Sequence, residues 1–155
     1  MNFFNTVSGK KELFTPNERK VGLYICGPTV YSDTHLGHAK SYVSFDVMKR
    51  WLEYRGHEVT HIQNFTDVSD ETALGASKEG IDELEFTRKY EKEFLDKMKL
   101  LSNTPATKYT RASDFVRQIA EETKKLLDAD EAYQTDEGVF LRIKQEEHGK
   151  LLGVD

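Results

Sequence analysis

The segment Leu23–His38 constrains the fold more than any other stretch of the chain, because a strand, a turn and a helix start follow one another within it. The apolar run Val21–Ile25 predicts a buried strand. The Cys-Gly-Pro sequence at 26–28 ends that strand and opens a turn. A long amphipathic helix is expected over 36–55. A glycine-bearing loop therefore connects the end of a strand to the N-terminus of a helix.

The predicted helix start carries residues that suit anion binding. The first N–H groups of a helix lack intrahelical acceptors and the helix dipole makes that end positive, so phosphates bind there. His35 and His38 are three residues apart and are expected on one face, and Gly37 has no side chain to keep a ligand from the backbone. Imidazoles at this place can donate hydrogen bonds to phosphate oxygens. The pattern predicts a phosphate site; the alternative is an ordinary pair of surface histidines.

A second strand extends this unit into a parallel sheet. β-Branched residues over 58–63 favour a strand, and Gly56 is suited to end the helix before it. A strand, a crossover helix and a second strand form a βαβ unit, which starts a doubly wound α/β sheet. The helix is expected to pack on the sheet through an apolar stripe of Ala39, Val43, Val47 and Trp51, widened by Phe45, Met48 and Leu52.

Two further helices are predicted after the second strand. A short one is expected over 71–80 with Asp70 as its N-cap, and a long one over 83–101 with Asp82 as its N-cap. The charged face of the long helix is expected to be an ordinary solvated surface.

The last third of the chain predicts a helix and a hairpin. The helix is expected to start at Ser113 or Asp114, and 133–143 is typical of a β-hairpin. The apolar residues expected to face inward from this helix are Phe115, Ile119, Leu126 and Leu127. Residues 1–20 are predicted to form a surface strand or hairpin without chemistry of their own.

Composition limits the classes of function. The chain has 155 residues, 37% hydrophobic and 32% charged, which predicts a soluble globular domain with a core of its own. No apolar run approaches the roughly 20 residues that span a bilayer, and we expect no membrane association. The single cysteine suits a reducing cytoplasm. The net charge of −5 argues against this chain holding a nucleic acid unaided.

One motif suggests a different chemistry. His57-Glu-Val-Thr-His61 matches the His-Glu-x-x-His motif of zinc proteases, in which both histidines lie one turn apart on a helix. Gly56 ends the preceding helix, and the β-branched residues after it favour a strand. We therefore expect His57 and His61 on or near a strand and not around zinc.

Two motifs together carry a resemblance. The Cys-Gly-Pro-Thr-Val-Tyr sequence at 26–31 and the His-Leu-Gly-His-Ala-Lys sequence at 35–40 resemble the signature of cysteinyl-tRNA synthetases. These are class I aminoacyl-tRNA synthetases with a Rossmann-like nucleotide-binding fold. The resemblance covers nearly all of the chain but only the first part of the family's catalytic region. It implies the first half of a Rossmann-like parallel sheet with crossover helices over 1–105, followed by an α+β segment over 106–155 that starts the connective insertion.

The resemblance also implies a reaction. The family activates cysteine with ATP and Mg²⁺ and transfers it to tRNA, and a zinc ion binds the substrate thiolate. The implied site residues are His35, Gly37 and His38 for ATP, with both histidines catalytic; Gly27, Thr29 and Thr66 for cysteine; and Cys26 for zinc.

Several parts of the family's site are expected outside this sequence. They include the other zinc ligands and the Lys-Met-Ser-Lys-Ser type loop, so the zinc site is expected to be incomplete and the chain inactive alone. Cys26 is either an unpaired zinc ligand or a core cysteine at a strand end. Leu95 stands where the family has an active-site histidine. The segment 64–70 resembles the family's Asn-x-Thr-Asp-x-x-Asp segment, but Ser69 and Glu71 stand where the family usually has a second acid and a lysine.

Three interpretations stay open. The chain is a cysteinyl-tRNA synthetase-like protein with an incomplete site, a truncated paralogue or split-enzyme subunit that binds a nucleotide or a protein partner, or a cysteine ligase of the mycothiol-pathway type. tRNA is expected as a partner only if further domains are supplied. Because half a doubly wound sheet exposes an edge, we expect self-association or a protein partner. The segment His148–Gly153 resembles the end of the family's hairpin.

Overall fold

The computed structural model describes residues 2–16, 19–143 and 149. The chain divides into two compact units, Glu18–Phe115 and a second unit of Met1–Asn17 with Val116–Asp155. Apart from Gly149, the predicted segment His148–Gly153 lies outside the described residues. Among the helices described, none has the length and apolar character needed to cross a membrane.

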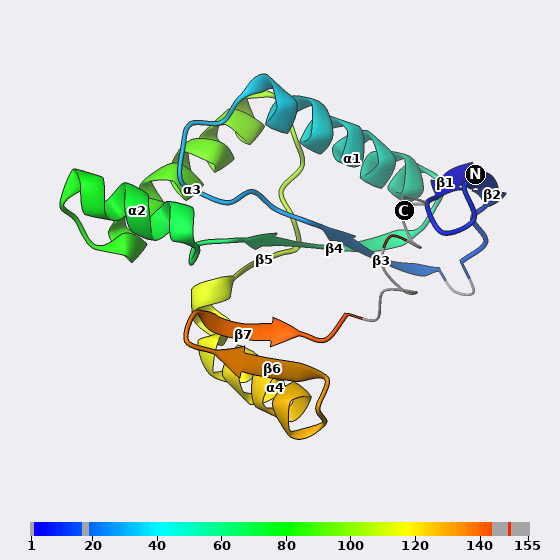
Figure 1. The fold of residues 1–155 in the computed structure, drawn as a ribbon. Helices are drawn as coiled ribbons and strands as arrows, with labels where there is room; N and C mark the ends of the chain where they lie inside the picture. The colour runs from blue at the N-terminus through cyan, green and yellow to red at the C-terminus, as the bar shows by residue number, and fades with distance from the viewer. Residues whose placement is uncertain (1, 17–18, 144–148, 150–155) are drawn as a thin grey trace. The chain divides into compact units, whose positions relative to one another are not determined.

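The larger unit is built on a parallel sheet covered on one face by helices (Figure 1). Its elements are β3 (Lys20–Ile25), α1 (Leu36–Tyr54), β4 (Glu58–Phe65), α2 (Asp70–Glu79), α3 (Glu83–Leu100), β5 (Lys108–Arg111) and the 3₁₀ helix η1 (Ala112–Phe115). The strand order is β3-β4-β5, and both neighbouring pairs are parallel. α1 connects β3 to β4, and α2 and α3 connect β4 to β5. The predicted α/β fold with crossover helices is confirmed.

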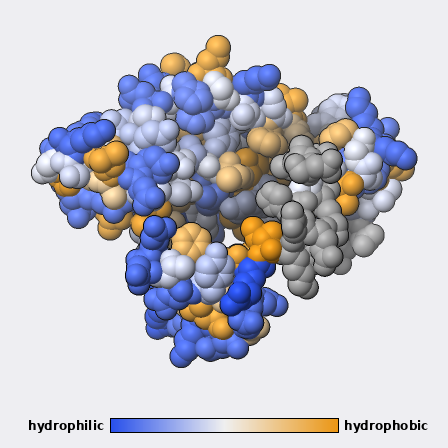
Figure 2. All heavy atoms as spheres, in the orientation of Figure 1, coloured by the Kyte–Doolittle hydropathy of each residue, from blue (hydrophilic) through white to orange (hydrophobic). Residues whose placement is uncertain are grey.

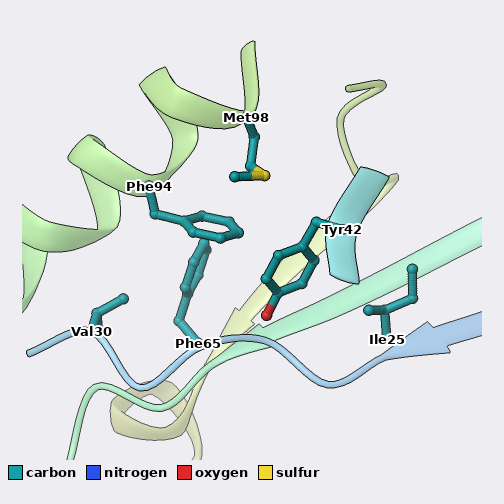
Figure 3. Packing of buried hydrophobic residues seen from close by; sticks show 6 residues of the cluster. All are labelled: Ile25, Val30, Tyr42, Phe65, Phe94 and Met98. Atoms are coloured by element: carbon teal, nitrogen blue, oxygen red, sulfur yellow. The ribbon is translucent and has the colours of Figure 1, made fainter. Parts of the chain in front are cut away.

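The core of this unit lies between the sheet and the helices α1 and α3. Phe65 of β4 is fully buried and packs edge-on against Phe94 of α3, with ring centroids 5.7 Å apart. Phe94 also packs edge-on against Tyr42 of α1, at 4.9 Å. Figure 3 shows these rings together with Val30 and Met98. Because side chains from the strands β3 and β4 and from the helices α1 and α3 meet here, this cluster holds α1 and α3 on the same face of the sheet.

The apolar stripe predicted for α1 is buried only in part, and this prediction was wrong for several residues. Leu52 is buried, but Val47 is 61% exposed, and Phe45 and Trp51 are also exposed. The helix instead turns Tyr42 and Lys49 toward the core. Hydrophobic side chains therefore remain among hydrophilic ones on the surface (Figure 2).

Helix caps follow the sequence closely, with one correction. Asp82 caps α3, as predicted: its side chain accepts hydrogen bonds from the backbone N–H groups of Leu84 and Glu85. The N-cap of α2 is Ser69 and not Asp70, because Ser69 forms a reciprocal capping box with Thr72. Asp70 lies in the first turn, where its negative charge still suits the helix dipole.

β5 is a strand that the sequence did not predict. Its four residues pair in parallel with Ile62–Phe65 of β4. The strand lies after residue 105, within the range expected to start the insertion, and the compact units divide between Phe115 and Val116. The assignment of 106–155 to an insertion stays a prediction.

The charged face of α3 was expected to be solvated, and this is corrected for Glu91, which is buried in a charged cluster; Lys89 and Lys92 of the same face are exposed. Asp67, fully buried after β4, accepts hydrogen bonds from Arg88 at 3.1 Å and from the hydroxyl of Ser113 at 2.6 Å. Glu91, 5% exposed, pairs with both Arg88 and Arg111. The cluster fastens α3 to the ends of β4 and β5.

The described residues of the smaller unit form two hairpins and a helix. They are the hairpin of β1 (Asn2–Asn5) and β2 (Lys10–Leu13), the helix α4 (Val116–Asp128), and the hairpin of β6 (Ala132–Thr135) and β7 (Gly138–Leu141). Both predicted hairpins are confirmed. The inward packing predicted for the last helix is not: α4 has no buried residue, and Ile119 is 52% exposed. Phe115, in η1 of the larger unit, is also exposed.

Candidate active site at the ends of β3 and β4

The loops that leave β3 and β4 lie side by side. Thr29 and Thr66 form a parallel bridge just beyond the two strands. The N–H of Thr66 donates to the carbonyl of Pro28 at 3.1 Å, and the N–H of Val30 donates to the carbonyl of Thr66 at 3.2 Å. Two of the three residues predicted to bind cysteine are thus adjacent across the gap between the loops, at the strand ends where ligands of such sheets bind.

Gly27, the third of these residues, is held tightly by β4. Its N–H donates to Oδ1 of Asn64 at 2.8 Å, and the same oxygen accepts the hydroxyl of Tyr24 at 2.9 Å. A Cβ at position 27 would lie 1.5 Å from the backbone carbonyl oxygen of Asn64. Packing alone therefore demands glycine here. Asn64 is a positioning residue that the sequence interpretation left without a role, although it stands at the end of the strand.

Cys26 lies at the end of β3 with its side chain exposed. Its carbonyl oxygen accepts the hydroxyl of Tyr42 at 3.1 Å, which ties the strand end to α1. Burial raises the pKa of Tyr42, so this hydroxyl stays protonated and can donate. Of the two alternatives for Cys26, exposure disfavours a core cysteine.

The zinc ion implied by the family does not fit these residues alone. Over the described part of the chain, no group of three or more His, Cys, Asp or Glu side chains lies close enough to hold a metal ion. A structural or substrate-binding zinc needs three or four ligands. Cys26 can supply one of them, and no step through zinc follows from this structure.

His35 and His38 cap α1 with each other. His35 is the N-cap, and its Nδ1 accepts the N–H groups of Gly37 at 3.1 Å and of His38 at 3.4 Å. In return, the N–H of His35 donates to Nδ1 of His38 at 3.4 Å. The two rings stack, with centroids 3.8 Å apart and planes 16° from parallel. The pair is thus a capping box built from imidazoles.

The cap fixes which nitrogen of each ring carries a proton. Because Nδ1 of both rings accepts a hydrogen bond, each neutral ring is protonated at Nε2. Burial and the neighbouring His35 lower the pKa of His38, while Glu93 acts in the opposite direction. His38 is therefore neutral at pH 7 and presents one Nε2–H donor.

The role of Gly37 in ATP binding stays a prediction, and the structure gives a second reason for glycine at this position. A Cβ there would lie 2.9 Å from Cε1 and 3.0 Å from Nδ1 of His35. The absence of a side chain lets the His35 ring fold back over the first turn. Since the N–H of Gly37 already donates to that ring, the histidine side chains are better placed than this N–H to meet an anion.

Glu93 of α3 fixes the loop before the histidines, and the sequence interpretation missed it. Its Oε2 accepts the N–H of Thr34 at 3.1 Å and its hydroxyl at 2.6 Å. No local signal marks Glu93, because it stands among other charged residues. Leu95, where the resemblance places a histidine, is half-buried against the core.

The zinc-protease interpretation is excluded by the backbone. β4 begins at Glu58, so His61 lies on a strand and His57 precedes it. His61 is buried on the face of the sheet that the helices cover.

Comparisons with known proteins agree with this architecture. The family of tRNA synthetases class I (C) catalytic domains matches residues 13–154. The cysteine–tRNA ligase of Thermococcus onnurineus (strain NA1) is 40% identical over 97% of this chain and 32% of its own length. That of Dehalococcoides mccartyi (strain BAV1) is 44% identical over 97% of this chain and 34% of its own length.

A solved structure shows the same fold. The LeuRS of Agrobacterium radiobacter K84, in a ternary complex with tRNA and LeuAMS, superposes with a TM-score of 0.63 at 18% identity, covering 76% of this chain and 15% of the LeuRS chain. The chain spans about a third of the length of the curated relatives it matches. Together with the motifs at 26–31 and 35–40, the matched range shows that the chain belongs to the class I (C) tRNA synthetase catalytic-domain family, in its cysteinyl-tRNA synthetase branch.

Proposed function

We propose that this chain supplies the first half of the active site of a cysteine–tRNA ligase. In that reaction the carboxylate of cysteine attacks the α-phosphate of ATP, forms cysteinyl adenylate and releases pyrophosphate. The cysteinyl group then passes to the 3′ end of tRNA and AMP leaves. The observation that carries the proposal is the stacked pair His35 and His38, which caps α1 beside the bridged loops at the ends of β3 and β4. The matching relatives bear the name cysteine–tRNA ligase.

The two histidines would bind the phosphates of ATP through their Nε2–H groups. Each ring has its Nδ1 held by the backbone, so its one remaining donor has a fixed place. Preorganised donors of this kind stabilise negative charge as it develops, without reorganisation during the reaction. Gly37 contributes by admitting the His35 ring over the first turn. Mg²⁺ would accompany the nucleotide.

Cysteine would bind beside this pair. Thr29 and Thr66 offer hydroxyl groups on adjacent loops, and Gly27 keeps the strand end close to β4. Cys26, exposed at the same end, would be one of several zinc ligands, the others coming from outside residues 1–155. The chain's own contribution is to hold the amino acid near the phosphate site.

Full activity would require further protein. Among the described strands, β3 pairs with β4 alone and leaves its other edge free, and such edges pair with another chain or segment. We propose that this edge takes the remaining part of a Rossmann-like sheet or drives self-association. tRNA would bind once the further domains are present, in the cytoplasm. No observation in the structure favours the paralogue or the mycothiol-pathway ligase.

Calorimetric titration with a non-hydrolysable ATP analogue and Mg²⁺ tests the phosphate site. His35→Asn is the informative variant, because asparagine is a good N-cap and preserves the helix start while removing the Nε2–H donor. We expect it to weaken nucleotide binding by about tenfold, as does the loss of one hydrogen bond to a charged group. Its melting temperature should stay close to that of the wild type.

Leu100→Ala is the matched control, because Leu100 is exposed on α3 and far in sequence from the histidines. It should bind the analogue like the wild type. Equal affinity of His35→Asn and wild type, or no heat from the wild type, would contradict the proposed phosphate site.

A further inference from the structure

A cavity of about 530 Å³ lies between the sheet and the helices α1 and α3. Its walls come from β3, β4 and β5 below and from the two helices above, all within the larger unit. A volume of this size is in the range of pockets that hold small organic ligands. None of the residues proposed for ATP, cysteine or zinc lines it.

Two buried polar side chains of β4 point into this cavity without partners. His61 is 6% exposed and Gln63 is 4% exposed, and both line the cavity. Both ring nitrogens of His61 and Nε2 of Gln63 find no hydrogen-bond partner among the residues that the structure describes. A buried donor or acceptor left without a partner costs about 1–3 kcal/mol, so such groups normally have one. These atoms therefore indicate a ligand that hydrogen-bonds to them.

The charges around the cavity favour a neutral ligand. Burial lowers the pKa of His61, and the nearby Lys49 lowers it further while Asp46 opposes this. The neutral imidazole offers one donor and one acceptor. Lys49 already donates to the carbonyl of Pro105 at 2.9 Å, and Asp46 accepts from Thr104 and Arg50. Asp96 and Lys99, which also line the cavity, are exposed, and Asp96 pairs with Lys92. The buried polar side chains of the wall, His61 and Gln63, are uncharged at pH 7 and suit a neutral polar group.

Much of the remaining wall is apolar and largely aromatic, while Asn103 and Thr104 add polar groups to it. The apolar part includes Ile25, Tyr42, Phe94 and Met98, which Figure 3 shows facing one another, and Tyr109 of β5. Aromatic walls of this kind stack on flat rings. A ligand must therefore combine an aromatic body with a polar group at the end nearest β4.

We infer that this cavity is a binding site for a small, neutral aromatic molecule whose hydroxyl, carbonyl or ring nitrogen hydrogen-bonds to His61 and Gln63. Rings of the ligand lie among Tyr42, Phe94 and Met98. The side-chain amide of Gln63 donates to the polar group, and His61 completes its hydrogen bonds. The site uses none of the side chains proposed above for ATP, cysteine or zinc, although Leu95, which lines it, stands where the family has an active-site histidine.

Binding of 2-naphthol, followed by NMR of ¹³C-methyl methionine, tests this inference. Met98 lines the cavity, whereas Met48 does not and serves as an internal reference. We expect a saturable shift of the Met98 methyl alone, nuclear Overhauser contacts between it and the naphthol ring, and a dissociation constant of about 0.1 mM. If water alone occupies the cavity, no saturable Met98 shift will be seen and the inference fails.

Variants locate the bound molecule. Gln63→Leu removes the donor at similar volume, and we expect it to weaken 2-naphthol binding about fivefold while leaving naphthalene, which lacks the hydroxyl, unaffected. Leu95→Trp should fill the cavity and abolish binding, whereas Leu100→Trp on the exposed side of the same helix should not. Equal loss for both probes in Gln63→Leu, or unchanged binding in a folded Leu95→Trp, would overturn the assignment. The wild-type Overhauser contacts decide the matter if a variant does not fold.

Discussion

The helices α3 and α4 are both amphipathic by sequence, yet the structure buries only one of them. α3 has five buried residues, among them Phe86, Phe94 and Met98. α4 has none, although Ile119 and Leu126 recur on one side of it. An apolar stripe predicts that a helix can pack, but a large partner surface is needed before it does.

The partners of the two helices explain the difference. α3 lies on a three-stranded sheet and beside α1, so residues from four elements close around Phe94. α4 has as its partner β6 of a two-stranded hairpin, whose strands have four residues each. A two-stranded hairpin is marginally stable by itself and offers little area to cover a helix. Burial here follows the size of the partner and not the strength of the pattern.

The strongest test of this comparison is a pair of truncations on the two helices. Phe94→Ala removes a ring that is 3% exposed and contacts both Tyr42 and Phe65, and we expect it to lower the free energy of unfolding by about 3–5 kcal/mol. Ile119→Ala, on α4, should cost less than about 1 kcal/mol because the side chain is 52% exposed. Urea denaturation followed by circular dichroism measures both. Equal losses would show that α4 is packed as tightly as α3.

A pair of glycines on the first strand and its loop sharpens the same contrast. Gly27→Ala forces a Cβ against the carbonyl oxygen of Asn64, and moving either backbone should cost about 1–3 kcal/mol. Gly22→Ala meets nothing within 4 Å of the new Cβ and should be neutral or slightly stabilising. Chemical denaturation of the two variants gives the difference. A neutral Gly27→Ala would mean that the strand end is loose, and the proposed cysteine pocket with it.

Local signals in the sequence were enough for most of the larger unit. The turn at Cys26–Pro28, the cap at Asp82 and the left-handed Gly80 each mark an element boundary through the chemistry of one or two residues. The strand-to-helix junction with His35 and His38 was predicted in the same way. The reciprocal cap between the two rings was not, because it depends on rotamers and not on residue type.

Non-local contacts account for what the sequence did not reveal. β5 has no apolar alternation and becomes a strand by pairing with β4, about 46 residues earlier in the chain. Asp67 and Glu91 resemble surface residues until Arg88, Arg111 and Ser113 surround them. Apart from the Arg88–Glu91 pair within α3, these partners lie 20 or more residues apart along the chain and leave no periodic signal. The cavity beside His61 could not be predicted from the sequence for the same reason, because its walls come from segments that lie far apart along the chain.

The pH dependence of stability due to His61 is the smallest effect that we predict. It tests whether the packed region between the sheet and the helices excludes water from His61. Burial and Lys49 hold the pKa of His61 below its ordinary value of 6.5, so the unfolded chain binds a proton that the folded chain resists. Its contribution to stability is therefore full above about pH 6.5 and is lost as the pH falls toward the folded-state pKa. Asp46, Asp96 and Lys99 also line the cavity, and Asp46 opposes the shift.

His61→Asn removes this titration and keeps a polar side chain. Between about pH 7.5 and 5.5, wild type should lose on the order of 1 kcal/mol more stability than the variant, measured as the difference between their urea unfolding free energies. His38, whose pKa is also lowered, titrates in the same window but equally in both proteins, so its effect cancels in the difference. Parallel pH profiles would show that water reaches His61 freely. The cavity would then be open to solvent at its polar end, and the packed region would owe its stability to the cluster around Phe94 alone.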